Sequence, residues 1–142
     1  MRLISGFVFA VLAAASGGAC MSGNSNGNGL IPIPGTPPQK TEVFTGSVAV
    51  GGSSFFDFAV ANVGDLTVTL TAAGPPSTVV MRIGLGVGTS TACSVQLVKD
   101  TAAGDTAQIS ASQVPAATYC IGIGDVGNAT GPVTFSITVV HT

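Results

Sequence analysis

Apolar and polar residues alternate with a period of two over most of the chain after residue 40. In residues 66–70 (LTVTL), three aliphatic side chains would share one side of an extended strand while two threonines occupy the other. One buried face and one solvated face produce this alternation in an antiparallel sheet. The same pattern predicts strands within eight segments: 42–50, 54–60, 65–72, 79–87, 94–98, 107–110, 119–124 and 133–139.

Turn-forming residues separate these segments, among them Gly51-Gly52, Gly74-Pro75-Pro76 and Gly131-Pro132. Short strands spaced by roughly 8–12 residues favour a sandwich or a barrel over folds with crossover helices. We therefore expect an all-β fold over residues 41–142, an antiparallel jelly-roll-like β-sandwich of about eight strands. The alternation does not specify the order of the strands within the sheets.

The N-terminal residues have the features of an export signal. Arg2 precedes an apolar stretch over residues 3–15, which is shorter than the about 20 residues needed to span a bilayer. Residues 17–20 (GGAC) are similar to a lipobox, in which the cysteine is acylated, although the lipobox usually has leucine where Gly17 stands. We predict a lipoprotein signal peptide over residues 1–19 and lipidation of Cys20. Ordinary signal cleavage, which would give a soluble secreted protein, is the alternative.

Residues 20–40 resemble a tether. Gly, Asn and Ser dominate the first half and four prolines the second, so the segment has too little apolar surface to fold. As a flexible coil, its length would be on the order of 25 Å. We predict a disordered spacer that holds the sandwich away from a membrane.

Charge and cysteine content narrow the possible partners. Charged residues make up 7% of the chain, against about 25% in typical soluble domains. Without Arg2, three basic residues face six acidic ones, a net charge of −3, and no basic patch is available for nucleic acid. If Cys20 is acylated, Cys93 and Cys120 form an even set that we expect to pair as a disulfide in an oxidising compartment.

Four segments together resemble the bacterial pre-peptidase C-terminal domain: 56–60 (FDFAV), 64–70 (GDLTVTL), 119–125 (YCIGIGD) and 133–139 (VTFSITV). The resemblance covers about residues 42–141. It implies a jelly-roll-like sandwich outside the cytoplasm with an accessory role in binding or solubility and no catalysis of its own. Related sandwiches in secreted collagenases bind calcium through acidic residues near their N-terminal edge. Here that region has only Glu42 and Asp57, so the metal site is not carried over.

Catalytic chemistry has few candidate residues. The only histidine, His141, is the penultimate residue, which we expect to be exposed at a frayed strand end. No serine lies in a G-x-S-x-G motif. A nucleophile would need a histidine partner and an acid to orient it. We therefore predict no enzyme activity, no catalytic residues and no cofactor.

The aspartates and glycines have structural interpretations. Asp57 is expected on the solvated face, near Arg82, and the other aspartates beside turns, where they accept hydrogen bonds from backbone groups. A calcium site from Asp100 with Asp105, or from Asp125 with Asn128, is an alternative, but no D-x-D-x-D-G loop is present and we predict no metal. Residues 84–88 (GLGVG) precede no helix, so we expect them to admit a bend or a second backbone rather than phosphate.

Two classes of function remain. The first is an interaction module, a non-catalytic lipoprotein of the outer membrane or cell surface that contacts an envelope or matrix protein. The second is a carbohydrate-binding module, which would need exposed aromatic rings. The chain has no Trp, and only Phe44 and Phe55 are expected to be available as a ligand platform, which disfavours the carbohydrate interpretation.

Overall fold

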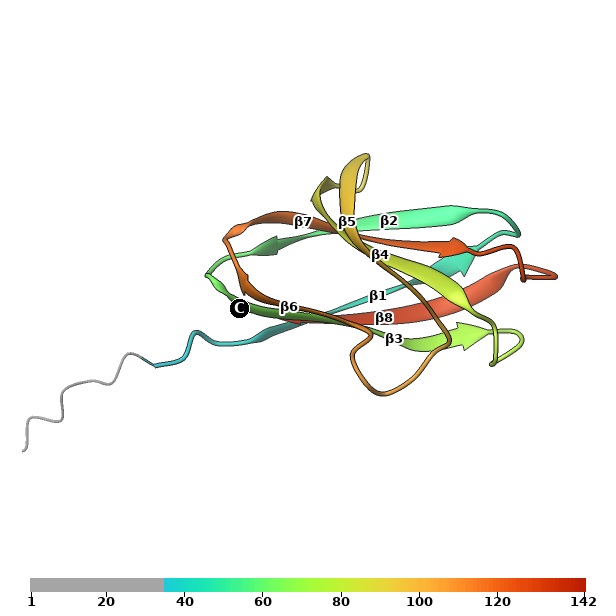
Figure 1. Ribbon diagram of the computed structural model, residues 1–142, viewed down its shortest axis with the longest axis horizontal. Helices are drawn as coiled ribbons and strands as arrows, with labels where there is room; N and C mark the ends of the chain where they lie inside the picture. Colours follow the sequence, from blue (N-terminus) through green and yellow to red (C-terminus); the bar gives the residue numbers. More distant parts are fainter. Residues whose placement is uncertain (1–34) are drawn as a thin grey trace, which may run out of the picture. The chain divides into compact units, whose positions relative to one another are not determined.

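The computed structural model describes residues 35–142, so the predicted signal peptide, Cys20 and most of the predicted tether lie outside the described residues. Within residues 35–142 all regular structure is β-strand, and no helix there is long and apolar enough to cross a membrane. Eight antiparallel strands form two four-stranded sheets that lie in two layers (Figure 1). The predicted all-β fold with about eight strands is confirmed.

The first sheet contains strands in the order β1-β8-β3-β6 and the second in the order β2-β7-β4-β5. Their bounds are β1 Lys40–Val48, β2 Ser53–Val60, β3 Gly64–Gly74, β4 Met81–Thr89, β5 Ala92–Thr101, β6 Ile109–Val114, β7 Ala117–Asp125 and β8 Val133–His141. Four nested pairs explain both orders, because β1 pairs with β8, β2 with β7, β3 with β6 and β4 with β5. Successive pairs alternate between the sheets, which is the arrangement of a jelly roll.

The hydrophobic core lies between the two sheets. The inward positions of β3, β7 and β8 are filled by aliphatic side chains that are almost completely buried, such as Leu70, Ile121 and Ile137. Phe56 packs between Phe44 and Phe135, with ring centroids 5.4 and 5.9 Å apart. Burying each such side chain stabilises the fold by about 1.5–3 kcal/mol. The core therefore accounts for the period-two pattern in the sequence.

The strand bounds differ from the predicted ones by up to about four residues, and the differences are largest for β5 and β6. The segment predicted at residues 107–110 is β6 at Ile109–Val114, because Gln108 is held by other hydrogen bonds. Its amide N–H donates to Val68 O at 3.0 Å, and its side-chain Oε1 accepts from Leu70 N at 2.7 Å. The segment predicted at residues 94–98 is the longer strand β5, whose side chains are mostly exposed because it forms one edge of the second sheet.

Candidate functional site

Glycines cover the centre of the outer face of the second sheet. On β7, the isoleucines that enter the core alternate with Gly122 and Gly124, which face outward. On β4, Gly84 and Gly86 face outward in the same way, and they alternate with Ile83 and Leu85, whose side chains are buried in the core. Since β7 and β4 are the two central strands, the middle of this face is a floor with no side chains.

Side chains from the two edge strands lie on this floor. A Cβ atom at Gly122 would be 2.6 Å from the ring of Phe55, which belongs to β2. A Cβ atom at Gly84 would be 2.8 Å from a methyl group of Val95, which belongs to β5. Any residue other than glycine at either position would have to displace the neighbouring side chain. The glycines therefore allow Phe55 and Val95 to lie against the sheet.

The beginning of β5 bends over the outer face of β4. Cys93 of β5 and Cys120 of β7 form a disulfide with a Cα–Cα distance of 5.8 Å, although β4 lies between their strands. Two strand spacings in a flat sheet would be about 9.5 Å. A Cβ atom at Gly86 would collide with the backbone of Ser94, so glycine is needed where the strands approach. The predicted disulfide and the predicted role of the 84–88 glycines are confirmed.

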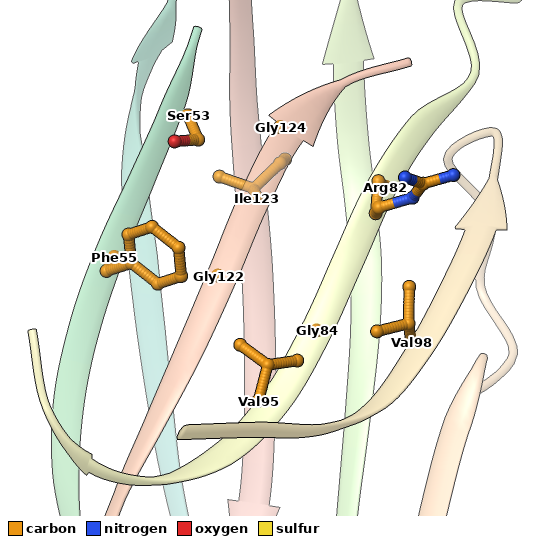
Figure 2. A pocket seen from close by; sticks show the side chains of 9 residues that line it. All are labelled: Ser53, Phe55, Arg82, Gly84, Val95, Val98, Gly122, Ile123 and Gly124. Carbon is orange, nitrogen blue, oxygen red and sulfur yellow. The ribbon is translucent and has the colours of Figure 1, made fainter. Parts of the chain in front are cut away.

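The floor and the edge-strand side chains form a hollow of about 130 Å³ that is open to solvent. Phe55 lies on one side and Val98 on the other, and the side chain of Val95 lies between them near Gly122 and Gly84 (Figure 2). Its exposed lining consists almost entirely of carbon. The complete lining is Ser53, Phe55, Arg82, Gly84, Val95, Val98, Gly122, Ile123 and Gly124.

Arg82 stands at the margin of the hollow with its charge already paired. Its Nε and Nη2 donate to the two carboxylate oxygens of Asp100 at 2.7 and 2.8 Å. The hydrogen bond with Arg82 lowers the pKa of Asp100, and the same pair raises the pKa of Arg82. We expected Arg82 to lie near Asp57, but its guanidinium group pairs with Asp100 instead. Asp57 accepts a hydrogen bond from Ser90 N at 3.2 Å.

Phe44 and Phe55 do not form a common platform, so this prediction is wrong. Phe44 is on β1 of the first sheet and packs against Phe56 and Phe58, at the margin of the core. Phe55 is on β2 of the second sheet, faces outward and is 39% exposed. The two rings are apart because β1 and β2 belong to different sheets. The period-two pattern alone does not reveal to which sheet a strand belongs.

His141 is buried rather than exposed, so the prediction of a frayed end is also wrong. Its side chain is 1% exposed, and its ring centroid lies 5.3 Å from that of Phe58 with the two rings tilted by 38°. It is buried because β8 runs through to His141, opposite Lys40 of β1. His141 Nε2 is 3.1 Å from Glu42 Oε1, which also pairs with Lys40 Nζ at 2.7 Å. Burial raises the pKa of Glu42, but hydrogen bonds from Lys40 and His141 outweigh it and leave the pKa below its ordinary value.

Asp125 holds a turn together, as predicted. Its Oδ2 accepts a hydrogen bond from Gly51 N at 2.9 Å, and its Oδ1 accepts from Gly127 N, Asn128 N and Ala129 N at 2.9, 3.1 and 3.2 Å. The bonds from Gly51 and Gly127 contribute most to a lowered pKa of Asp125. Among residues 35–142, no three His, Cys, Asp or Glu side chains gather where they could hold a metal ion.

The sequence interpretation did not identify the hollow. Val95 and Val98, which line it, are 39% and 56% exposed, although a strand prediction gives no reason to expect apolar residues on a solvated face. A signal was nevertheless present. Glycines occupy the outward positions of both 84–88 (GLGVG) and 122–124 (GIG), so two strands have the same empty face.

Comparison with protein-family models gives no match, and comparison with curated proteins gives none. Among solved structures, the domain is similar to Aeromonas hydrophila PliG, a periplasmic lysozyme inhibitor of g-type lysozyme. The TM-score is 0.48 at 14% sequence identity, and the match covers 70% of this chain and 83% of that chain. At this level of similarity we draw no functional conclusion from the match.

Proposed function

We propose that this chain is a non-catalytic lipoprotein, anchored through Cys20 outside the cytoplasm, whose sandwich binds a protein of the cell envelope or matrix. The observation that carries the binding role is the hollow on the second sheet. Large apolar side chains beside a concave surface are a feature of interaction sites. Phe55, Val95 and Val98 provide such side chains around the hollow.

The arrangement of the titratable groups supports a non-catalytic role. The one histidine, His141, is buried against Glu42, so it is not available to a substrate or to a nucleophile at the surface. Asp100 and Asp125 are engaged by Arg82 and by backbone N–H groups. None of these carboxylates borders another in a cleft, which acid–base catalysis by a carboxylate pair requires.

The N-terminal signal and the disulfide support an extracytoplasmic location. A Cys93–Cys120 disulfide persists in oxidising compartments and is rare in the cytosol. We extend the proposal to a relationship with the pre-peptidase C-terminal domain, here displayed on a tether of about 20 residues. Carbohydrate binding is less well supported, because within residues 35–142 no second aromatic ring pairs with Phe55 to form a platform for a sugar ring.

The binding role is testable by photo-crosslinking in intact cells. A photoreactive amino acid would replace Phe55 or, as a matched control, Val43. Val43 is 59% exposed and lies on the outer face of the first sheet, away from the hollow. We expect a discrete crosslinked protein from position 55 and none from position 43. Export at normal level with no crosslink from position 55 or from position 98 would refute the proposed function.

The anchor is testable by an intact mass of the protein from its native membrane. We expect a chain that begins at Cys20 and carries acyl groups, and we expect Cys20→Ser to move the protein into the soluble fraction. A mass without lipid, beginning at Ser16 or Cys20, would instead establish a soluble secreted protein.

A further inference from the structure

We propose that the free edge of β5, at residues 97–101, binds an extended segment of the partner protein as an added β-strand, with an acidic side chain of that segment opposite Lys99. This inference rests on the proposed function and names the conformation and the charge of the segment that is bound.

The groups that would recognise the segment are those of the backbone. β5 is the last strand of the second sheet, so it pairs with β4 along one side and with no described strand along the other. An unpaired strand edge presents N–H and C=O groups at the spacing that a second extended chain matches. The pairing of β5 with β4 skips Gln96, where the register shifts. The regularly paired part of the edge is therefore residues 97–101.

Apolar side chains are exposed on both faces of this edge. Val98 lies opposite Gly84, on the outer face, and is 56% exposed. Leu97 lies opposite Leu85, on the face toward the first sheet, and is 43% exposed. A globular surface would cover one of these faces, whereas an added strand contacts both of them through cross-strand pairs. Exposure on both faces therefore favours a strand as the occupant.

Lys99 gives the edge a charge preference. Lys40 Nζ lies 2.7 Å from Glu42 Oε1. Arg82 is paired with Asp100. Among residues 35–142, Lys99 is the remaining Lys or Arg, and it is exposed with no carboxylate of these residues within salt-bridge distance. Opposite charges on directly paired residues stabilise two strands, so the segment should place Asp or Glu opposite Lys99.

The segment fits a different protein better than a second copy of this chain. Full antiparallel overlap of residues 97–101 with the same residues of a second copy has a two-fold axis at the central position. That position is Lys99, so two like charges would lie directly opposite each other and destabilise the pair. The tether does not supply the acid either, because residues 20–39 contain no Asp or Glu.

The test is NMR titration of the full exported chain carrying Cys20→Ser with short capped peptides. In the first peptide Val alternates with Thr around a central Glu, and in the second Lys replaces the Glu. We expect the Glu peptide to shift the amide signals of residues 97–101 saturably and to slow their exchange with solvent. The Lys peptide should bind about fivefold more weakly. Equal binding of the two peptides, or binding only at another strand edge, would overturn the inference.

A charge swap locates the acidic residue. Lys99→Glu changes an exposed side chain, so the fold should be retained. We expect this variant to prefer the Lys peptide, by about fivefold. Val43→Glu is the control, because it adds the same carboxylate to an exposed position of β1, and it should keep the preference for the Glu peptide. An unchanged preference in the Lys99→Glu chain would contradict the assignment.

The use of the backbone is tested with two N-methylated forms of the Glu peptide. The N–H groups of alternate residues in an extended chain point to opposite edges. One form carries N-methyl groups on the Val residues, and the other carries them on Glu and the flanking Thr residues. We expect only one of the two forms to lose binding, because an added strand uses one of its edges. Equal affinities of the two forms would show that strand pairing is not the mode of binding.

Further outcomes separate this inference from the proposed function. A crosslink from position 55 in cells, without saturable peptide binding at residues 97–101, would overturn the strand assignment and leave the interaction role intact. Peptide binding at this edge with no crosslink from position 55 or 98 would support the edge as a strand-binding surface and refute the proposed function. A dimer in solution with residues 97–101 protected from exchange, in the absence of any peptide, would assign the edge to a second copy and overturn the inference.

Discussion

Removal of the Cys93–Cys120 disulfide should destabilise the domain, and the length of the loop that the disulfide closes determines by how much. The disulfide joins residues separated by 27 positions, and the loop-closure model assigns about 3.5 kcal/mol to a loop of this length. In a domain of this size that loss lowers Tm by about 15 °C. The crosslink ties β5, an exposed edge strand, to β7, so its loss should leave the core between the sheets intact.

The assay is equilibrium urea unfolding of the Cys20→Ser chain with and without the additional changes Cys93→Ala and Cys120→Ala. Alanine avoids placing a hydroxyl at position 120, where the side chain is fully buried. We expect a lower midpoint and faster amide exchange in residues 88–95, with unchanged exchange in β1 and β8. Val43→Ala is the control, because Val43 is largely exposed and lies outside the loop that the disulfide closes.

Two results would contradict this reasoning. A loss below about 1 kcal/mol would mean that the crosslink hardly restricts the unfolded chain, contrary to the loop-closure model. A loss well above 5 kcal/mol, with faster exchange in β1 and β8 as well, would mean that the disulfide supports the core itself.

Three other changes test the packing and the electrostatics. Ile137→Ala, at a fully buried position of β8, should cost about 2–5 kcal/mol in chemical unfolding, and a cost below 1 kcal/mol would contradict the described core. Gly86→Ala should lower Tm far more than Gly124→Ala, because a Cβ at Gly86 would clash with the backbone of Ser94, whereas a Cβ at Gly124 would make only ordinary van der Waals contacts. Equal melting temperatures would argue against the bend in β5. The pKa of Asp125 is lowered in the folded state, so its ionised form stabilises the domain above the unfolded pKa of about 3.9, and this contribution disappears as pH falls through the folded pKa. Asp125→Ala should therefore show a smaller loss of unfolding free energy between pH 7 and pH 3, and an unchanged loss would remove Asp125 from the acid response.

The elements were predictable because each depends on residues close in sequence. Leu66, Val68 and Leu70 alternate with threonines whatever they pack against, and Gly74-Pro75-Pro76 interrupts a strand in any fold. Asp125 was expected to stabilise its own turn, and three of its four hydrogen bonds are indeed to the next few residues. Local geometry decides such features.

The candidate site was not predictable to the same extent, because its parts come from four strands. Phe44 and Phe55 have similar surroundings in the sequence, yet one packs at the core and the other faces solvent. The nested pairing of strands places β2 and β5 at opposite edges of one sheet, and only then do Phe55 and Val95 reach over the glycines of the two central strands. His141 was misjudged for the same reason, since its burial depends on β1, almost the whole domain away in sequence.

The sequence by itself therefore determined the class of fold, the approximate positions of the strands, most of their inward faces, and the residue types able to pair as a disulfide, because alternation and turn chemistry act over a few residues. Only the tertiary structure decided which face of the second sheet would be hollow and which side chains would border it. Those properties depend on strand order and on the bend of β5 over Gly86, which are set by contacts between residues distant in the chain.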